Sequence, residues 1–146
     1  MVAAHILLVE DNPDDEELTL LSLRKHDLAN DVVVVRDGVE ALEYLFGEGE
    51  YSGRDVSRMP AVVLLDLKLP RLDGLGVLKR LREDARTRYV PVVVLTSSSQ
   101  DADILTSYQL GANSYIRKPV EFGELTDTVS KVGQYWMTLN RAPQGG

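Results

Sequence analysis

The chain has 146 residues, of which 44% are hydrophobic and 27% charged, and its formal net charge is −7. This length suits one domain. Cysteine is absent, which excludes disulfides and thiolate metal sites. The acidic balance disfavours binding to nucleic acid or to an anionic membrane surface, and no apolar run approaches the ~20 residues that span a bilayer. The first ten residues do not resemble a signal peptide, so we expect a cytoplasmic protein.

Apolar runs alternate with helical patterns along the chain. In chain order the sequence predicts strand 6–9, helix 13–26, strand 32–35, helix 38–46, strand 62–65, helix 75–83, strand 92–95, helix 101–110, strand 114–118 and a helix from about 120 to 139. Asn12 and Pro13 are typical of a helix start, and Gly111 of a helix end. A long polar loop covers 47–60. Five strands alternating with five helices predict a parallel sheet covered on both faces.

Polar residues end four of the predicted strands. They are Glu10 and Asp11 after the first strand, Asp66 at the end of the third, Thr96 at the end of the fourth and Lys118 at the end of the fifth. The carboxyl ends of parallel strands share one edge of the sheet, and ligands of such sheets bind beyond that edge. The sequence therefore predicts that three carboxylates, a hydroxyl and an ammonium meet there.

These side chains suit a particular chemistry. Three carboxylates repel one another unless a cation is present, and oxygen ligands without His or Cys favour Mg²⁺. The ammonium of Lys118 and the hydroxyl of Thr96 are suitable partners for phosphoryl oxygens. The set predicts phosphoryl transfer to a carboxylate nucleophile.

Four segments then carry a family resemblance: residues 9–11, 65–74, 95–97 and 111–119. Together they resemble the receiver domain of two-component response regulators, over roughly residues 4 to 125. The resemblance implies a flavodoxin-like (βα)5 fold, a doubly wound sheet of five parallel strands in the order 2-1-3-4-5. We expect the receiver domain to cover residues 1–140 and a disordered tail to cover 141–146.

The resemblance also implies roles for the residues at the strand ends. Asp66 matches the aspartate that accepts a phosphoryl group from a histidine kinase. Glu10 and Asp11, with Asp66 and the backbone carbonyl of Lys68, match the Mg²⁺ ligands. Glu10 departs from the commoner pair of aspartates, which leaves open whether it binds the metal directly or through water. Such a domain is not an enzyme in its own right but assists its own phosphorylation and dephosphorylation.

The remaining implied roles concern switching. Lys118 matches the lysine that contacts the phosphoryl group, and Thr96 and Tyr115 match the coupled switch pair. The peptide between Lys118 and Pro119 is expected to be cis, as in this family.

The last predicted helix suggests a partner surface. Its apolar residues from Phe122 to Leu139 follow a heptad pattern and outrun the sheet. We therefore expect a homodimer formed through the fourth helix, the fifth strand and the fifth helix, with Tyr135, Trp136 and Leu139 at the interface. This helix end and the long loop before Pro60 also resemble single-domain regulators that partner phytochrome-type histidine kinases.

Two other functions remain open. A haloacid-dehalogenase-like phosphatase also uses an aspartyl nucleophile, but it needs a second carboxylate two residues later, where Lys68 stands. A flavodoxin-like FMN-binding module shares the topology, but the acidic residues after the first strand would repel a phosphate. The four acidic residues 14–17 are interpreted as charges that stabilise a helix N-terminus, with no direct role in holding the metal.

Overall fold

The structure, a computed structural model, describes residues 5–25, 31–119, 121–141 and 143. Five parallel strands form one sheet in the order β2-β1-β3-β4-β5. The strands are β1 (Ile6–Val9), β2 (Val32–Val35), β3 (Val62–Leu65), β4 (Val92–Thr96) and β5 (Ser114–Arg117). The helices are α1 (Pro13–Arg24), α2 (Gly38–Phe46), α3 (Gly74–Glu83), α4 (Asp101–Gln109) and α5 (Phe122–Gln134). The predicted flavodoxin-like topology and strand order are confirmed.

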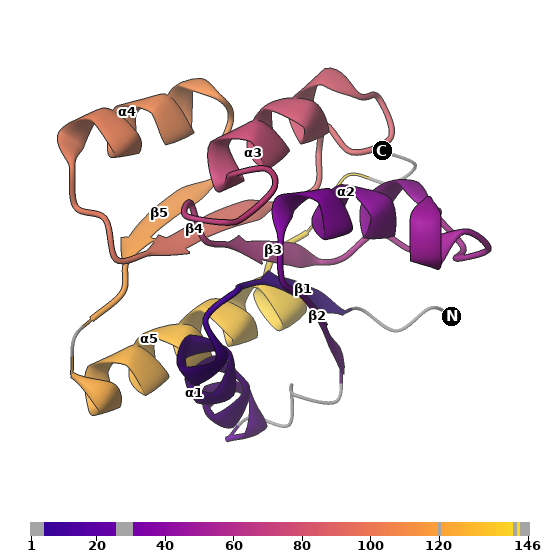
Figure 1. The fold of residues 1–146 in the computed structure, drawn as a ribbon. Coiled ribbons are helices and arrows are strands. Elements are labelled where there is room, and N and C mark those ends of the chain that lie inside the picture. The colour runs from indigo at the N-terminus through magenta and orange to yellow at the C-terminus, as the bar shows by residue number, and fades with distance from the viewer. Residues whose placement is uncertain (1–4, 26–30, 120, 142, 144–146) are drawn as a thin grey trace.

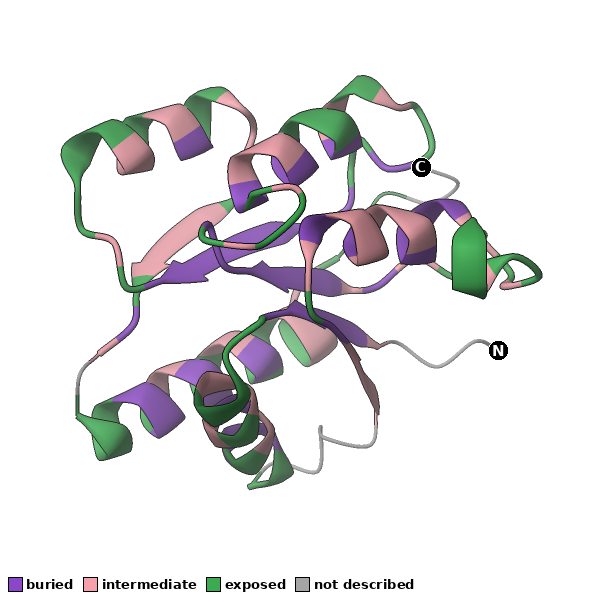
Figure 2. Cartoon of the chain, viewed as in Figure 1, coloured by how far each residue is buried: buried purple, intermediate pink, exposed green. Residues whose placement is uncertain are grey.

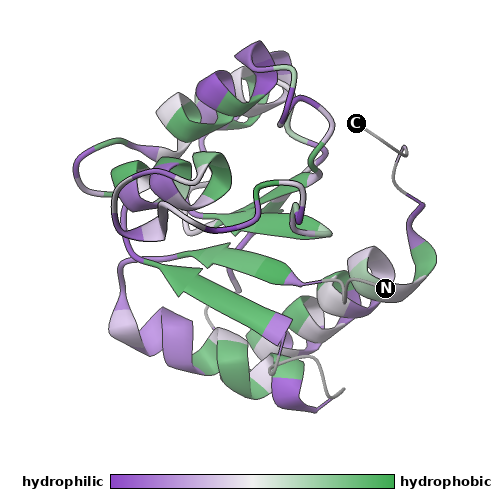
Figure 3. Cartoon of the chain, turned by 90° about the vertical axis from the view of Figure 1, so that its right-hand side faces the viewer, coloured by the Kyte–Doolittle hydropathy of each residue, from purple (hydrophilic) through white to green (hydrophobic). Residues whose placement is uncertain are grey.

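Helices cover both faces of the sheet, with α1 and α5 on one side and α2, α3 and α4 on the other (Figure 1). Because successive strand residues point to opposite faces, Leu7 and Val9 join one core cluster while Ile6 and Leu8 join the other. The central strands are buried, and exposed residues concentrate on the outer surfaces of the helices (Figure 2). Burial on both faces explains the almost uniformly apolar strands that Figure 3 shows between the helix layers.

Side-chain caps fix where three of the helices begin. The side chain of Asn12 accepts hydrogen bonds from the backbone N–H groups of Asp14 and Asp15, as the sequence predicted for the start of α1. Asp37 caps α2 and Asp73 caps α3 in the same way. Each cap immediately follows a strand or a strand-end loop, so the helix N-termini are set close to the sheet edge.

The C-terminal segment differs from the prediction. The expected single helix to Leu139 is α-helical only to Gln134, and a π-helical segment, η3 (Tyr135–Leu139), follows. The wider turn is closed by the N–H of Asn140, which donates to the carbonyl of Tyr135 at 2.9 Å. It lets Trp136 pack against the core cluster under α5. A continuous heptad face is therefore not maintained to the end of the helix.

Smaller differences occur at other boundaries. The first helix ends at Arg24, and the expected end near residue 26 lies outside the described residues, as does residue 120, where the last helix was expected to begin. The predicted loop 47–60 contains a 3₁₀ turn, η2 (Gly49–Tyr51). The predicted tail 141–146 falls mostly on residues that the structure does not describe. Within the described ranges, no helix has the length and apolarity to cross a membrane.

Candidate functional site

The sheet register brings the predicted polar residues to one edge. Val9 of β1 lies beside Leu65 of β3, and Leu65 lies beside Val94 of β4. Glu10 and Asp66 directly follow the first two of these positions, and Thr96 is the last residue of β4, two residues after Val94. The three residues therefore emerge along the same edge. Lys118 follows β5 directly, and its backbone N–H donates to the carbonyl of Thr96.

The ammonium of Lys118 is the centre of the site. Its Nζ donates to Glu10 Oε1 at 2.6 Å, to Asp66 Oδ2 at 2.9 Å and to Asp15 Oδ2 at 2.9 Å. An ammonium has three donor hydrogens, so these contacts use its full capacity. The side chain of Lys118 is only 8% exposed, so the three carboxylates accept the hydrogen bonds that water would accept from an exposed ammonium.

Burial and pairing shape the charge of this cluster. Burial alone would lower the pKa of Lys118, but the hydrogen bonds to Glu10 and Asp15 outweigh it and raise that pKa. Burial raises the pKa of Glu10, and the hydrogen bond from Lys118 opposes that rise. Lys118 is thus held charged, while the surrounding carboxylates outnumber it.

The acidic oxygens fit a hard cation. Glu10, Asp11 and Asp66 each offer one carboxylate oxygen, and these oxygens lie within 4.8 Å of one another. Glu10 and Asp66 are buried, whereas Asp11 is exposed, so the set faces solvent on one side. The donors are all oxygens, as Mg²⁺ or Mn²⁺ prefers. The backbone N–H of Lys68 donates to Asp66 Oδ1 at 3.3 Å, which places Lys68 beside the cluster.

Glycine allows the loop after β3 to fold closely over the strand end. A Cβ on Gly74 would lie 2.2 Å from the carbonyl oxygen of Asp66. The N–H of Gly74 donates to the carbonyl of Leu67 at 2.9 Å, so the start of α3 is tied to the segment that carries Asp66. A side chain at position 74 would push this segment away, which gives the sequence Asp73-Gly74 a structural reason.

Thr96 and Tyr115 lie on neighbouring strands with different environments. Thr96 is fully buried, and its Oγ1 has no hydrogen-bond partner among the described residues. Tyr115 is partly buried, and its hydroxyl donates to the carbonyl of Ser98 at 2.9 Å, in the loop that follows β4. A buried hydroxyl without a partner costs free energy, which indicates a position kept for a ligand oxygen. The switch role of the pair stays a prediction.

Thr96→Val is expected to stabilise the unphosphorylated chain by about 1 kcal/mol, because it removes a buried hydroxyl that makes no hydrogen bond. Thr87→Val is the matched control. Thr87 is equally buried, but its hydroxyl donates to the carbonyl of Leu81 at 2.7 Å, so this variant is expected to lose about 1 kcal/mol. Urea unfolding measures both, and destabilisation by Thr96→Val would contradict the interpretation.

Asp15 belongs to the site although the sequence did not predict it. The acidic turn 14–17 was interpreted as helix-terminal charge, and Glu16 fits that view, since it pairs with Arg36 on the surface. Asp15 instead reaches inward to Lys118. The only available signal was that this turn follows β1 at the sheet edge. Which of four adjacent carboxylates points to the site depends on the rotation of α1.

The expected cis peptide is wrong for this structure. No cis peptide bond occurs in the described ranges, so the bond between Lys118 and Pro119 is trans. The preference of such bonds for trans is small, about 0.5–1 kcal/mol, and a Lys-Pro sequence by itself does not determine the isomer.

The three predicted interface residues differ in exposure. Tyr135 and Leu139 are 47% and 70% exposed, whereas Trp136 is partly buried against the core and stacks edge-on with Tyr135. Tyr135 and Leu139 are thus available to a partner. Trp136 mainly secures the end of the helix to the sheet.

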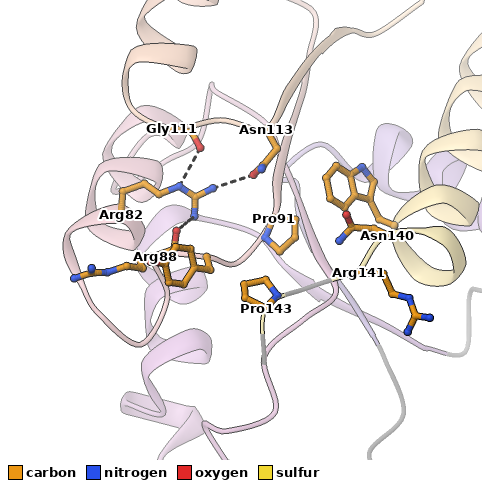
Figure 4. Close-up of a pocket in the computed structure, with 10 residues that line it drawn as sticks. Arg82, Arg88, Pro91, Gly111, Asn113, Asn140, Arg141 and Pro143 are labelled. Carbon is orange, nitrogen blue, oxygen red and sulfur yellow. Dashed lines mark hydrogen bonds between the residues drawn. The ribbon is translucent and has the colours of Figure 1, made fainter. Parts of the chain in front are cut away.

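A hollow of about 410 Å³ lies at the other end of the strands, and Trp136 lines part of it. Figure 4 shows its floor, where the guanidinium of Arg82 donates to the carbonyl of Gly111 and to Asn113 Oδ1. The side chains of Arg88 and Arg141 extend in opposite directions, away from the hollow (Figure 4). Arg82 thus joins the loops around the hollow, and among the described residues no cationic groups converge on it to form an anion site.

Comparisons with known proteins agree with this geometry. The response regulator Rcp1 of Synechocystis sp. is 35% identical over 138 residues, which cover 94% of this chain and 92% of Rcp1. The crystal structure of its Mn²⁺-bound form covers 96% of this chain and 99% of that chain, with a TM-score of 0.87 and 33% identity. The phosphorylated cyanobacterial phytochrome response regulator RcpA gives a TM-score of 0.89 at 38% identity and covers 98% of this chain and 100% of its own.

The bacteriophytochrome response regulator AtBRR is 50% identical, with a TM-score of 0.75, and covers 97% of this chain and 100% of its own. The family model of the response regulator receiver domain matches residues 6–130. These matches span nearly the whole chain and include each strand end that builds the acidic site. The chain therefore belongs to the response regulator receiver domain family.

Proposed function

We propose that this chain is a single-domain response regulator in which Asp66 accepts a phosphoryl group from a phytochrome-type histidine kinase in the cytoplasm. One observation carries the proposal. The carboxylate of Asp66 lies at the sheet edge, 2.9 Å from the ammonium of Lys118, and the buried, unpartnered hydroxyl of Thr96 belongs to the last residue of the adjacent strand β4. A nucleophile, a cation and a hydroxyl donor are thus gathered where phosphoryl oxygens would need them.

The transfer uses these groups in defined roles. An oxygen of Asp66 attacks the phosphorus of the kinase phosphohistidine, the P–N bond breaks, and the imidazole leaves with the bonding electron pair. Lys118 and Thr96 donate to the phosphoryl oxygens. Glu10, Asp11, Asp66 and the backbone carbonyl of Lys68 would hold Mg²⁺, which when bound neutralises charge on those oxygens.

The output is a shift between two conformations. A new hydrogen bond from Thr96 to the phosphoryl group moves its side chain and opens space for the ring of Tyr115, whose hydroxyl now contacts the loop carbonyl of Ser98. The ring of Tyr115 packs against the core cluster that contains Leu7 and Val9, so movement of the ring alters the surface between α4 and β5. Phosphorylation then favours one existing state over another.

We also propose a homodimer through α4, β5 and α5. Exposed apolar side chains support it: Leu105 and Tyr108 on α4, Phe122 on α5, and Tyr135 and Leu139 in η3. Large apolar residues of this kind are costly on a surface without a partner. Light scattering measures the mass, and a monomer at every concentration, phosphorylated or not, would contradict the dimer.

The alternatives lack support at the same edge. Lys68, not a second acid, stands two residues after Asp66, where a dehalogenase-like phosphatase needs its general acid or base. Glu10, Asp11 and Asp15 place negative charge where a flavodoxin would hold the phosphate of FMN. The proposed phytochrome partnership is supported by the similarity to RcpA, described as a phytochrome response regulator, and to AtBRR, described as a bacteriophytochrome response regulator.

The test is phosphoryl transfer from a purified, autophosphorylated bacteriophytochrome kinase in the presence of Mg²⁺, followed by intact mass spectrometry. One phosphoryl group per chain is expected, and chelation of the metal with EDTA should abolish the gain. A histidine kinase without a phytochrome sensor, used at equal phosphohistidine concentration, is the control for partner choice. No transfer from either kinase or from acetyl phosphate would refute the function, while equal transfer from both would refute only the phytochrome partnership.

A further inference from the structure

The first turn of α1 supplies a contact that the reaction described above does not use. Asp15 is the third residue of α1, and its Oδ2 accepts a hydrogen bond from Lys118 Nζ at 2.9 Å. Its backbone N–H is held by the side chain of Asn12 at 3.2 Å, so the residue is fixed within the capped turn. Asp15 lies outside the set of three carboxylates that can hold the metal.

We propose that Asp15 is a positioning residue that holds Lys118 before phosphorylation and gives up its hydrogen bond to the incoming phosphoryl group. The inference rests on the proposed function of Asp66. It assigns α1 a part in the reaction, because the contact joins the N-terminus of that helix to the lysine at the end of β5.

The donor count requires such an exchange. Lys118 has three donor hydrogens, and Glu10, Asp15 and Asp66 occupy all three. To donate to a phosphoryl oxygen, the ammonium must therefore release one carboxylate. Asp66 carries the phosphoryl group itself and stays close to the ammonium throughout.

Exposure identifies which contact is released. The side chain of Glu10 is 3% exposed and makes the shortest contact, 2.6 Å, whereas the side chain of Asp15 is 31% exposed. A released Glu10 would leave a buried carboxylate without a cation, which is expensive. A released Asp15 turns to water at much lower cost. Asp15 is accordingly the partner that yields.

Two consequences follow for the reaction. Before transfer, the charge of Asp15 repels an anionic phosphoryl donor and keeps a hydrogen of Lys118 occupied, so Asp15 slows phosphorylation. After transfer, the first turn of α1 loses its tie to β5. The phosphorylated state therefore differs from the unphosphorylated state at the N-terminus of α1 as well as at Tyr115.

The kinetic test uses two variants with the same change of charge. Asp15→Asn is expected to raise the second-order rate constant of phosphorylation by acetyl phosphate with Mg²⁺ roughly fivefold, the factor for an ion pair of this exposure. Asp14→Asn is the control, because Asp14 lies in the same turn and its carboxylate is exposed, with no hydrogen bond or ion pair in the described part of the chain. The rate constant of Asp14→Asn is expected to stay at the wild-type value. Asp15→Glu keeps the carboxylate, so it is expected to be phosphorylated as slowly as the wild type.

A second measurement begins with a comparison that needs neither metal nor phosphoryl transfer. Amide hydrogen exchange of the peptide that covers α1 is expected to be faster in metal-free Asp15→Asn than in the metal-free wild type, because a neutral amide oxygen accepts a weaker hydrogen bond from the ammonium than a carboxylate does. Phosphorylation of the wild type should produce the same acceleration, and phosphorylation of Asp15→Asn should add nothing.

Each outcome decides the proposal. The proposal is supported if Asp15→Asn, but not Asp14→Asn, is phosphorylated faster than the wild type and the exchange pattern above is observed. Equal acceleration by Asp14→Asn would show a general charge effect and overturn it, as would slower phosphorylation of Asp15→Asn or an α1 unaffected by phosphorylation. Failure of the wild type to gain a phosphoryl group refutes the proposed function, and the role of Asp15 falls with it, whereas the other negative outcomes leave the function of Asp66 intact.

Discussion

Asp66→Asn is expected to abolish the gain of one phosphoryl group when the chain is incubated with Mg²⁺ and acetyl phosphate. An amide oxygen is a much weaker nucleophile than a carboxylate oxygen, and the amide adds no charge to a metal site. The fold should persist, since the amide oxygen can still accept the hydrogen bond from Lys118 Nζ that Asp66 Oδ2 accepts at 2.9 Å. Intact mass spectrometry measures the loss, which is the largest effect expected for any single substitution here.

The control for this experiment is another carboxylate-to-amide change. Glu83→Gln lies at the exposed end of α3, outside the acidic cluster, and is expected to leave phosphorylation unchanged. Thermal unfolding adds an independent readout. Mg²⁺ should raise the melting temperature of the wild type more than that of Asp66→Asn, because a ligand that binds more tightly stabilises the folded state more. A phosphoryl group that remains on Asp66→Asn would place the acceptor elsewhere.

Much of this site was predictable because it depends on topology and little on side-chain detail. Once five apolar strands are taken as parallel, Glu10, Asp66, Thr96 and Lys118 must emerge at one edge, and the structure places them there. The order of the strands was not deducible from periodicity. It came from the family resemblance, and the structure confirms it.

The features that were missed depend on rotation about an element and on backbone detail. Asp15 reaches Lys118 because of how α1 is rotated on the sheet, and the spacing of residues 14–17 does not determine that rotation. The heptad pattern assumed an unbroken α-helix, but η3 widens the last turn and takes Trp136 toward the core. The isomer of the peptide before Pro119 involves a small free-energy difference, which a two-residue sequence cannot specify.

Lys118→Met is expected to have the second largest effect, on both stability and phosphorylation. The variant keeps the apolar stem of the side chain but removes the cation from among Glu10, Asp66 and Asp15. Removing one partner of a buried ion pair leaves uncompensated charge, so the free energy of unfolding in EDTA should fall by about 3 kcal/mol at neutral pH. Phosphorylation by acetyl phosphate should slow by at least a factor of about 100, because a charge-assisted donor to the phosphoryl group is lost.

Added Mg²⁺ should distinguish this account from a general packing defect. A divalent cation beside the carboxylates replaces part of the missing charge, so Mg²⁺ should stabilise Lys118→Met more than it stabilises the wild type. Lys131→Met is the matched control, because Lys131 is 75% exposed and, among the residues that the structure describes, forms an ion pair only with Asp127 on the surface of α5. Little change is expected there. Urea unfolding in EDTA and in Mg²⁺ gives both comparisons. If Mg²⁺ stabilised Lys118→Met no more than the wild type, the ammonium and the metal would not be neutralising the same carboxylates, and the site would need a different electrostatic description.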